Sequence, residues 1–157
     1  CCTRGFLDRQ KKYLNKHSST ASRLSHRIAC SLGVQYDLYL ESFDVKTAFL
    51  QGLRFGELDK KAKELGFEVK ADREVWFVPP DNFWRRLREI PNSGIYIEDW
   101  MIGHHILELL QAVYGLVDGP IMLQLALLHY LTQHCGLYKP VHDNNFLILT
   151  EGWKILI

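Results

Sequence analysis

The chain has 157 residues, of which 47% are hydrophobic and 24% are charged, and its formal net charge at pH 7 is +1. These values are typical of one ordinary folded domain with a hydrophobic core, and they exclude an extensively disordered chain. No apolar run reaches the roughly 18 residues that a membrane-spanning helix needs, so we expect no association with a membrane.

The charge is distributed unevenly along the chain. Residues 1–30 hold seven basic residues and one acidic residue, Asp8, which gives this part a net charge of +6. The seven basic residues are Arg4, Arg9, Lys11, Lys12, Lys16, Arg23 and Arg27. A basic segment joined to an acidic body indicates either a partner that carries phosphates or a solvated basic tail, and charge alone leaves both open.

The cysteines and the N-terminus bear on cellular context. The four cysteines have no Cys-x-x-Cys spacing, which argues against a zinc site and against a disulfide framework. Cys30 and Cys135 fall on predicted helices, where we expect buried, reduced thiols. The chain begins at Cys1 without a signal-peptide pattern. We therefore expect an intracellular protein of unassigned compartment, and a chain that is a piece of a larger protein.

Residues 1–35 predict a basic segment followed by one helix. Ser18, Ser19 or Thr20 can cap a helix that extends to about Leu32, and Gly33 follows as its end. Apolar residues at helical spacing predict the buried stripe of this helix: Ala21, Leu24, Ile28 and Leu32. Beside that stripe the helix presents Arg23 and Arg27 one turn apart.

The stretch around Asp44 allows two interpretations. Aromatic and aliphatic residues recur with period two over residues 36–42, which predicts a half-buried strand leading to Asp44. A short helix over residues 45–50 follows, and Gly52 ends it. Asp44 at the end of a rigid strand suits a metal-binding catalytic carboxylate, or it simply caps the next helix. From local sequence, Phe49 is a core aromatic residue.

The remaining elements alternate between helices and strands. Residues 57–65 predict an amphipathic helix that points Leu58, Ala62 and Leu65 inward and is closed by Gly66. A strand over residues 74–78, a helix over 81–88 and a turn at 91–94 follow. We expect helices over residues 98–114 and 120–135, the second with Pro120 at its first position, and strands over 145–149 and 153–157.

Two blocks of this sequence resemble a known enzyme family. Residues 43–52, FDVKTAFLQG, are similar to the first catalytic motif of reverse transcriptases from copia-type retrotransposons, and residues 110–116, LQAVYGL, followed by Pro120, resemble that family's "ALYGLKQAP" segment. Residues 75–80 resemble its short strand ending in proline. Residues 3–6 and 18–23 fall where its fingers segment lies, so the resemblance covers nearly the whole chain.

The resemblance implies site residues, a cofactor and partners. It implies that Asp44 is a catalytic carboxylate and a ligand of Mg²⁺, two ions of which act in the full-length enzyme. It implies that Phe49 lies under the sugar of the incoming nucleotide and excludes a 2′-hydroxyl. Arg4, and after it Arg23, would meet template and nucleotide, unless both pair with surface acids. The implied partners are an RNA template, a DNA primer, deoxynucleotides and the remainder of a polyprotein.

The sequence also departs from the family. Asp118 replaces the glutamine beside the nucleotide, and Ile121 and Leu123 replace the arginine and tryptophan after the proline. A carboxylate facing a triphosphate would repel it unless a metal intervened. The chain ends at Ile157, just before the position of the family's catalytic Asp-Asp hairpin, so we expect these 157 residues not to extend a primer.

Two hypotheses of different classes result. In the first, the chain is the fingers-and-palm fragment of a copia-type reverse transcriptase, an RNA-directed DNA polymerase that is inactive as given. In the second, it is a non-catalytic, decayed remnant that acts at most as a nucleic-acid-binding or interaction module. The expected fold is α+β, an incomplete fingers and palm with a basic segment at residues 1–35 and, over 36–157, a small antiparallel sheet that carries Asp44 and is backed by helices.

Overall fold

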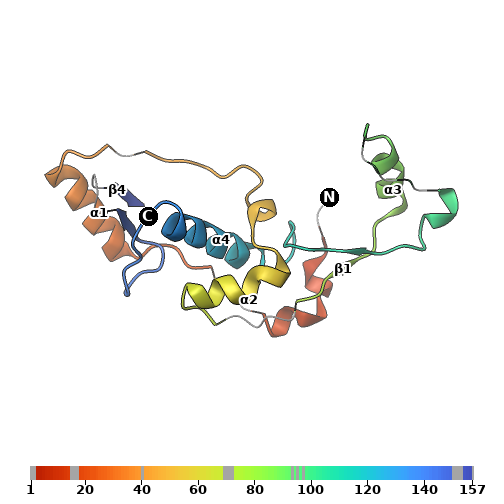
Figure 1. The fold of residues 1–157 in the computed structure, drawn as a ribbon, viewed down its shortest axis with the longest axis horizontal. Coiled ribbons are helices and arrows are strands. Elements are labelled where there is room, and N and C mark those ends of the chain that lie inside the picture. The colour runs from red at the N-terminus through yellow and green to blue at the C-terminus, as the bar shows by residue number, and fades with distance from the viewer. Residues whose placement is uncertain are drawn as a thin grey trace.

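The computed structural model describes residues 3–14, 18–39, 41–68, 73–92, 94, 96, 98–149 and 154–156. Over these residues the protein is mixed α+β, with four α-helices and two separate two-stranded antiparallel sheets, so the predicted fold class is confirmed at this level. The molecule is elongated: α1 and α3 lie at opposite ends, and α2 and α4 lie between them (Figure 1).

The hydrophobic core forms where α2 (Phe55–Glu64) packs against α4 (Gly119–Gln133). Both helices were predicted, and the inward side chains expected for α2 are buried. The buried cluster consists of Leu53, Phe55, Leu58, Ala62, Leu65, Ala112, Leu116, Ile121, Met122, Leu125, Leu128 and Leu147. Gly66, which was predicted to close the first of these helices, has a left-handed φ of 77°, and Gly136 beyond the second has a φ of 68°.

Helix α1 (Arg23–Gln35) is confirmed as an element, but its predicted buried stripe is wrong. Leu24 is 66% exposed, and the buried residue on the helix is Ser25. The Asp143 carboxylate accepts hydrogen bonds from the Ser22 N–H at 2.7 Å and from the Ser25 hydroxyl, which turns the serine face inward. Ser22 is the N-cap, slightly later than expected, and the helix continues past Gly33.

The predicted strand leading to Asp44 is absent from the described residues 36–39 and 41–45, which form a turn and irregular backbone. The side chain of Tyr39 is 97% exposed, so this segment has no core to pack against, and alternation alone does not make a strand. It connects α1 to the 3-10 helix η3 (Ala48–Gln51) (Figure 1). Thr47 has a left-handed φ of 52°, which confines the predicted helix to this later part.

The predicted helix over residues 98–114 is also wrong. The strand β1 (Trp76–Phe77) pairs antiparallel with β2 (Leu107–Glu108), so this segment contributes a strand and the 3-10 helix η4 (Asp99–Met101). Gly103, with a φ of 82°, interrupts any helix there. The chain between β1 and β2 carries α3 (Asp81–Arg88), which is confirmed as an element, in an arm that extends from the body (Figure 1).

Both predicted C-terminal strands are present, the first of them shorter than expected, and they pair with each other. The strand β3 (Leu147–Leu149) pairs antiparallel with β4 (Lys154–Leu156), and Ile148 lies opposite Ile155. Residues 153 and 157, the two ends of the second predicted strand, lie outside the described residues. No helix in the part of the chain that the structure describes is both long and apolar enough to cross a bilayer.

The expectation of buried thiols is wrong. Cys30 lies on α1 and Cys135 lies just after α4, and both are exposed free cysteines. Neither residue belongs to the buried cluster or to the side chains packed against it.

Candidate functional site

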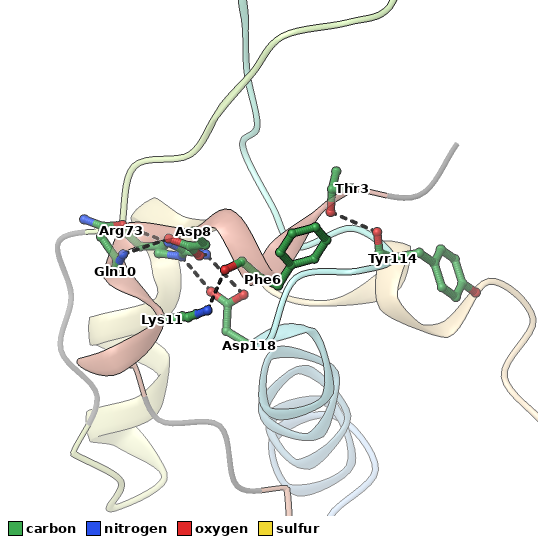
Figure 2. A network of polar contacts seen from close by, with 8 residues as sticks. All are labelled: Thr3, Phe6, Asp8, Gln10, Lys11, Arg73, Tyr114 and Asp118. Carbon is green, nitrogen blue, oxygen red and sulfur yellow. Dashed lines mark hydrogen bonds and ion pairs between the residues drawn. The ribbon is translucent and has the colours of Figure 1, made fainter.

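The first and second motif blocks meet the N-terminal residues at the start of α4. We call residues 3–12 the N-terminal segment; it contains the 3-10 helices η1 (Gly5–Leu7) and η2 (Arg9–Lys12). It lies against the turn at residues 114–119, where the Thr3 N–H and hydroxyl donate to the Tyr114 carbonyl at 2.8 and 3.0 Å (Figure 2).

The contact between Gly5 and Gly115 is too close for a side chain. A Cβ atom placed on Gly5 would lie 1.9 Å from the carbonyl oxygen of Gly115, and Gly5 itself is buried. Only glycine can occupy this position without moving one of the two backbones. Because Gly5 packs against the 114–119 turn, its neighbours Arg4 and Phe6 are held beside that turn.

Phe49 reaches the same turn from η3. Its ring lies 5.1 Å from that of Tyr114 between centroids, and a Cβ atom on Gly119 would lie 3.5 Å from the Phe49 ring. The side chain is half-buried. These contacts agree with the interpretation of Phe49 as a packing residue, and they bring it onto the surface where the N-terminal segment docks.

The four site residues predicted from sequence do not form one cluster. Arg4 is exposed and lies beside Gly5, so Arg4 and Phe49 both belong to the surface around the 114–119 turn. Arg23 is the first residue of α1, which lies at one end of the molecule (Figure 1). Asp44 is exposed on the irregular connection before η3. The strand that was expected to hold Asp44 rigidly is absent there, so its position rests on irregular backbone.

A buried ionic cluster, which the sequence did not indicate, lies beneath the N-terminal segment. We call Asp8, Gln10, Arg73 and Asp118 the Arg73 cluster (Figure 2). The Arg73 side chain is fully buried and donates from Nε to Asp118 at 2.8 Å, from one Nη to Asp8 at 2.5 Å and from the other to Gln10 at 2.8 Å. Its guanidinium also lies over the Phe55 ring, 5.6 Å from the centroid.

The electrostatics of the cluster favour its charged form. Burial raises the pKa of the Asp8 carboxyl, but hydrogen bonds from Arg73 and from the Gln10 N–H outweigh burial, so this pKa lies below its ordinary value. Burial lowers the pKa of Arg73, but its hydrogen bonds to Asp8 and Asp118 outweigh burial, so this pKa lies above its ordinary value. The guanidinium is therefore charged at neutral pH.

The cluster changes the interpretation of Asp118. The sequence suggested a free carboxylate that would repel a triphosphate, but the Asp118 side chain is 3% exposed and paired with Arg73. No local pattern marks Arg73, because it lies between Asp72 and Glu74 in a charged stretch that is typical of a solvated loop.

Neither a metal site nor a related protein indicates a function for this surface. Within the described ranges, no three His, Cys, Asp or Glu side chains are arranged to hold a metal ion. No protein family, curated protein or solved structure matches this chain.

Proposed function

We propose that the chain is a fragment of an RNA-directed DNA polymerase of the copia-type retrotransposon class, which transfers nucleotides by a two-metal mechanism in its full-length form. One observation supports this proposal. The three segments that carry most of the resemblance, residues 3–6, 43–52 and 110–120, meet at the start of α4 through Thr3, Gly5 and Phe49. A single nucleotide-binding surface requires such convergence of segments that are distant in sequence.

In this proposal the residues have separate roles. Arg4 meets phosphate on the exposed side of the N-terminal segment, and the accessible part of the Phe49 ring contacts the sugar of a deoxynucleotide. Asp44 is a ligand of Mg²⁺ in the full-length enzyme, where other carboxylates complete the site. A two-metal site needs carboxylates that hold ions about 3.5–4 Å apart, and Asp44 alone cannot hold both. The partners are an RNA template, a DNA primer and the remainder of a polyprotein.

The proposal is tested by binding and extension assays on the purified chain. We expect it to bind a deoxynucleoside triphosphate and an RNA–DNA hybrid with Mg²⁺ present, and not to extend the primer. Arg4→Gln and Phe49→Ala should each weaken triphosphate binding about tenfold, the effect of one charge-assisted contact or one lost stacking contact. Arg23→Gln has the same charge change as Arg4→Gln and should weaken binding of the hybrid only.

Two outcomes would contradict these expectations. A chain that binds neither triphosphate nor hybrid at low salt is not a piece of such a polymerase. Primer extension by the chain alone would refute its predicted inactivity.

A second candidate function is that of a non-catalytic nucleic-acid-binding module. It is favoured by the exposed cations at the N-terminal end that make no ion pair with any described residue: Arg4, Arg9, Lys12, Arg23 and Arg27. Exposed cations that are not held in ion pairs can neutralise the phosphates of a nucleic acid, which releases its counterions.

Asp44→Asn separates the two candidates. In the polymerase fragment, this change lowers the affinity for Mg²⁺ measured with triphosphate present. In the non-catalytic module, it leaves both metal and hybrid binding unchanged, while hybrid binding still falls steeply with salt.

A further inference from the structure

The basic N-terminal segment is attached to the body through a charge that no ligand can reach. Arg73 precedes β1, its side chain is fully buried, and two of its three acceptors, Asp8 and Gln10, belong to the N-terminal segment. The third acceptor, Asp118, is the N-cap residue of α4. One guanidinium therefore joins the N-terminal segment to the start of the core helix.

The attachment has two parts that act on different ends of the segment. Thr3 and Gly5 hold one end against the 114–119 turn, and the Arg73 cluster holds the other end at η2. The Asp8 carboxylate also accepts from the Gln10 N–H at 2.9 Å and so begins η2. Loss of the Asp8 charge thus weakens the bond of η2 to the body, and the amide of an Asp8→Asn variant can still cap η2.

We propose that the Arg73 cluster is a latch that holds the N-terminal segment in its nucleic-acid-binding position, so that Asp8 and Arg73 are positioning residues for that surface. Neither residue touches a phosphate: Arg73 is buried, and Asp8 has the wrong charge. This inference rests on the proposed binding of nucleic acid. The latch itself is a property of the chain that is measured without any ligand.

Asp8→Asn distinguishes a latch from simple electrostatics because the two predict opposite signs. The substitution removes a negative charge from a segment that is otherwise basic, so electrostatic attraction alone would tighten binding of an RNA–DNA hybrid. A latch would instead be weakened, because a neutral amide holds the guanidinium less strongly than a carboxylate does. The segment would leave the body and its cations would no longer be fixed together.

The first measurement is limited trypsin digestion without nucleic acid. The N-terminal segment contains the cleavage sites Arg4, Arg9, Lys11 and Lys12, and cleavage under native conditions follows local opening. Asp8→Asn should accelerate cleavage in this segment about tenfold, as expected for the loss of one charge-assisted hydrogen bond. Asp59→Asn is the matched control: Asp59 pairs with Lys63 on the surface of α2 at 2.6 Å, and its loss should leave cleavage unchanged.

The second measurement is the affinity for an RNA–DNA hybrid as a function of salt. We expect Asp8→Asn to bind about tenfold more weakly than the natural chain, while Asp59→Asn binds at least as tightly. Gln10→Leu removes an acceptor of Arg73 without changing charge and should also accelerate cleavage and weaken binding. If circular dichroism shows that Asp8→Asn does not fold, the Gln10→Leu variant tests the latch in its place.

The outcomes separate this inference from the proposed function. Unchanged cleavage in Asp8→Asn and Gln10→Leu would overturn the latch. Faster cleavage with tighter hybrid binding would overturn the positioning role. If the natural chain binds no hybrid, the proposed function and the positioning role that rests on it both fail, and the cleavage comparison still decides whether the latch exists.

Discussion

At the scale of single residues, Gly5 is the position where the N-terminal segment tolerates no side chain. Gly5→Ala places a methyl group against the Gly115 carbonyl oxygen, and relief requires the two backbones to separate. We expect the free energy of unfolding to fall by about 1–3 kcal/mol, the usual cost of overpacking. Urea denaturation measures this change.

Gly33→Ala provides a control of opposite sign. Gly33 lies within α1, and a Cβ atom there would meet no other atom within 4 Å. Alanine should therefore stabilise the protein by up to about 1 kcal/mol through helix propensity. If Gly5→Ala raises the urea midpoint as Gly33→Ala is expected to do, the close contact between Gly5 and Gly115 is refuted.

A second residue-scale prediction concerns Asp143 and pH. Burial raises the pKa of the Asp143 carboxyl, but hydrogen bonds from Ser22, Ser25 and Asn145 outweigh burial, so this pKa lies below its ordinary value. The carboxylate therefore contributes stability above the ordinary pKa of about 4, and this contribution is lost as the pH falls through the lower, folded-state pKa. Asp143→Asn should be less stable at pH 7 and should lose less stability between about pH 5 and 2. Urea unfolding across that range would contradict this if the variant and the natural chain had equal slopes.

At the scale of elements, burial distinguishes α4 from α1. Leu125 on α4 is completely buried between α2 and the rest of the core, so Leu125→Ala should cost about 2–5 kcal/mol of unfolding free energy. Leu24 on α1 belongs to a stripe that looks buried in the sequence but is exposed, so Leu24→Ala should cost less than about 0.5 kcal/mol. Equal losses for the two substitutions would show that α1 packs on the protein through its apolar face.

The same contrast explains which elements the sequence predicts. Residues 57–65 were predicted correctly because their apolar stripe is the face that α4 covers. Residues 98–114 have a similar helical pattern, but the pairing of β2 with β1 and the left-handed Gly103 outweigh it. Periodicity predicts an element only where a partner surface exists for the apolar face, and the sequence does not reveal that partner.

At the scale of the whole molecule, the mixture of predicted helices and strands was enough to predict the α+β class. The same signals did not predict the Arg73 cluster. Asp8 lies 65 residues before Arg73 in the sequence, and Asp118 lies 45 residues after it. Buried polar groups have no periodic signature, and three charged residues in separate loops look like solvated surface. The order of the motifs along the sequence therefore suggested the proposed site. It did not suggest the Arg73 cluster beneath the N-terminal segment.

The docking of the N-terminal segment also sets an order of events during synthesis. Thr3 and its acceptor Tyr114 are separated by 111 residues, so residues 3–12 are synthesised well before the turn against which they dock. At about 5–20 residues per second, the wait is roughly 5 to 20 s. Throughout that interval the basic N-terminal segment lacks the surface against which it docks.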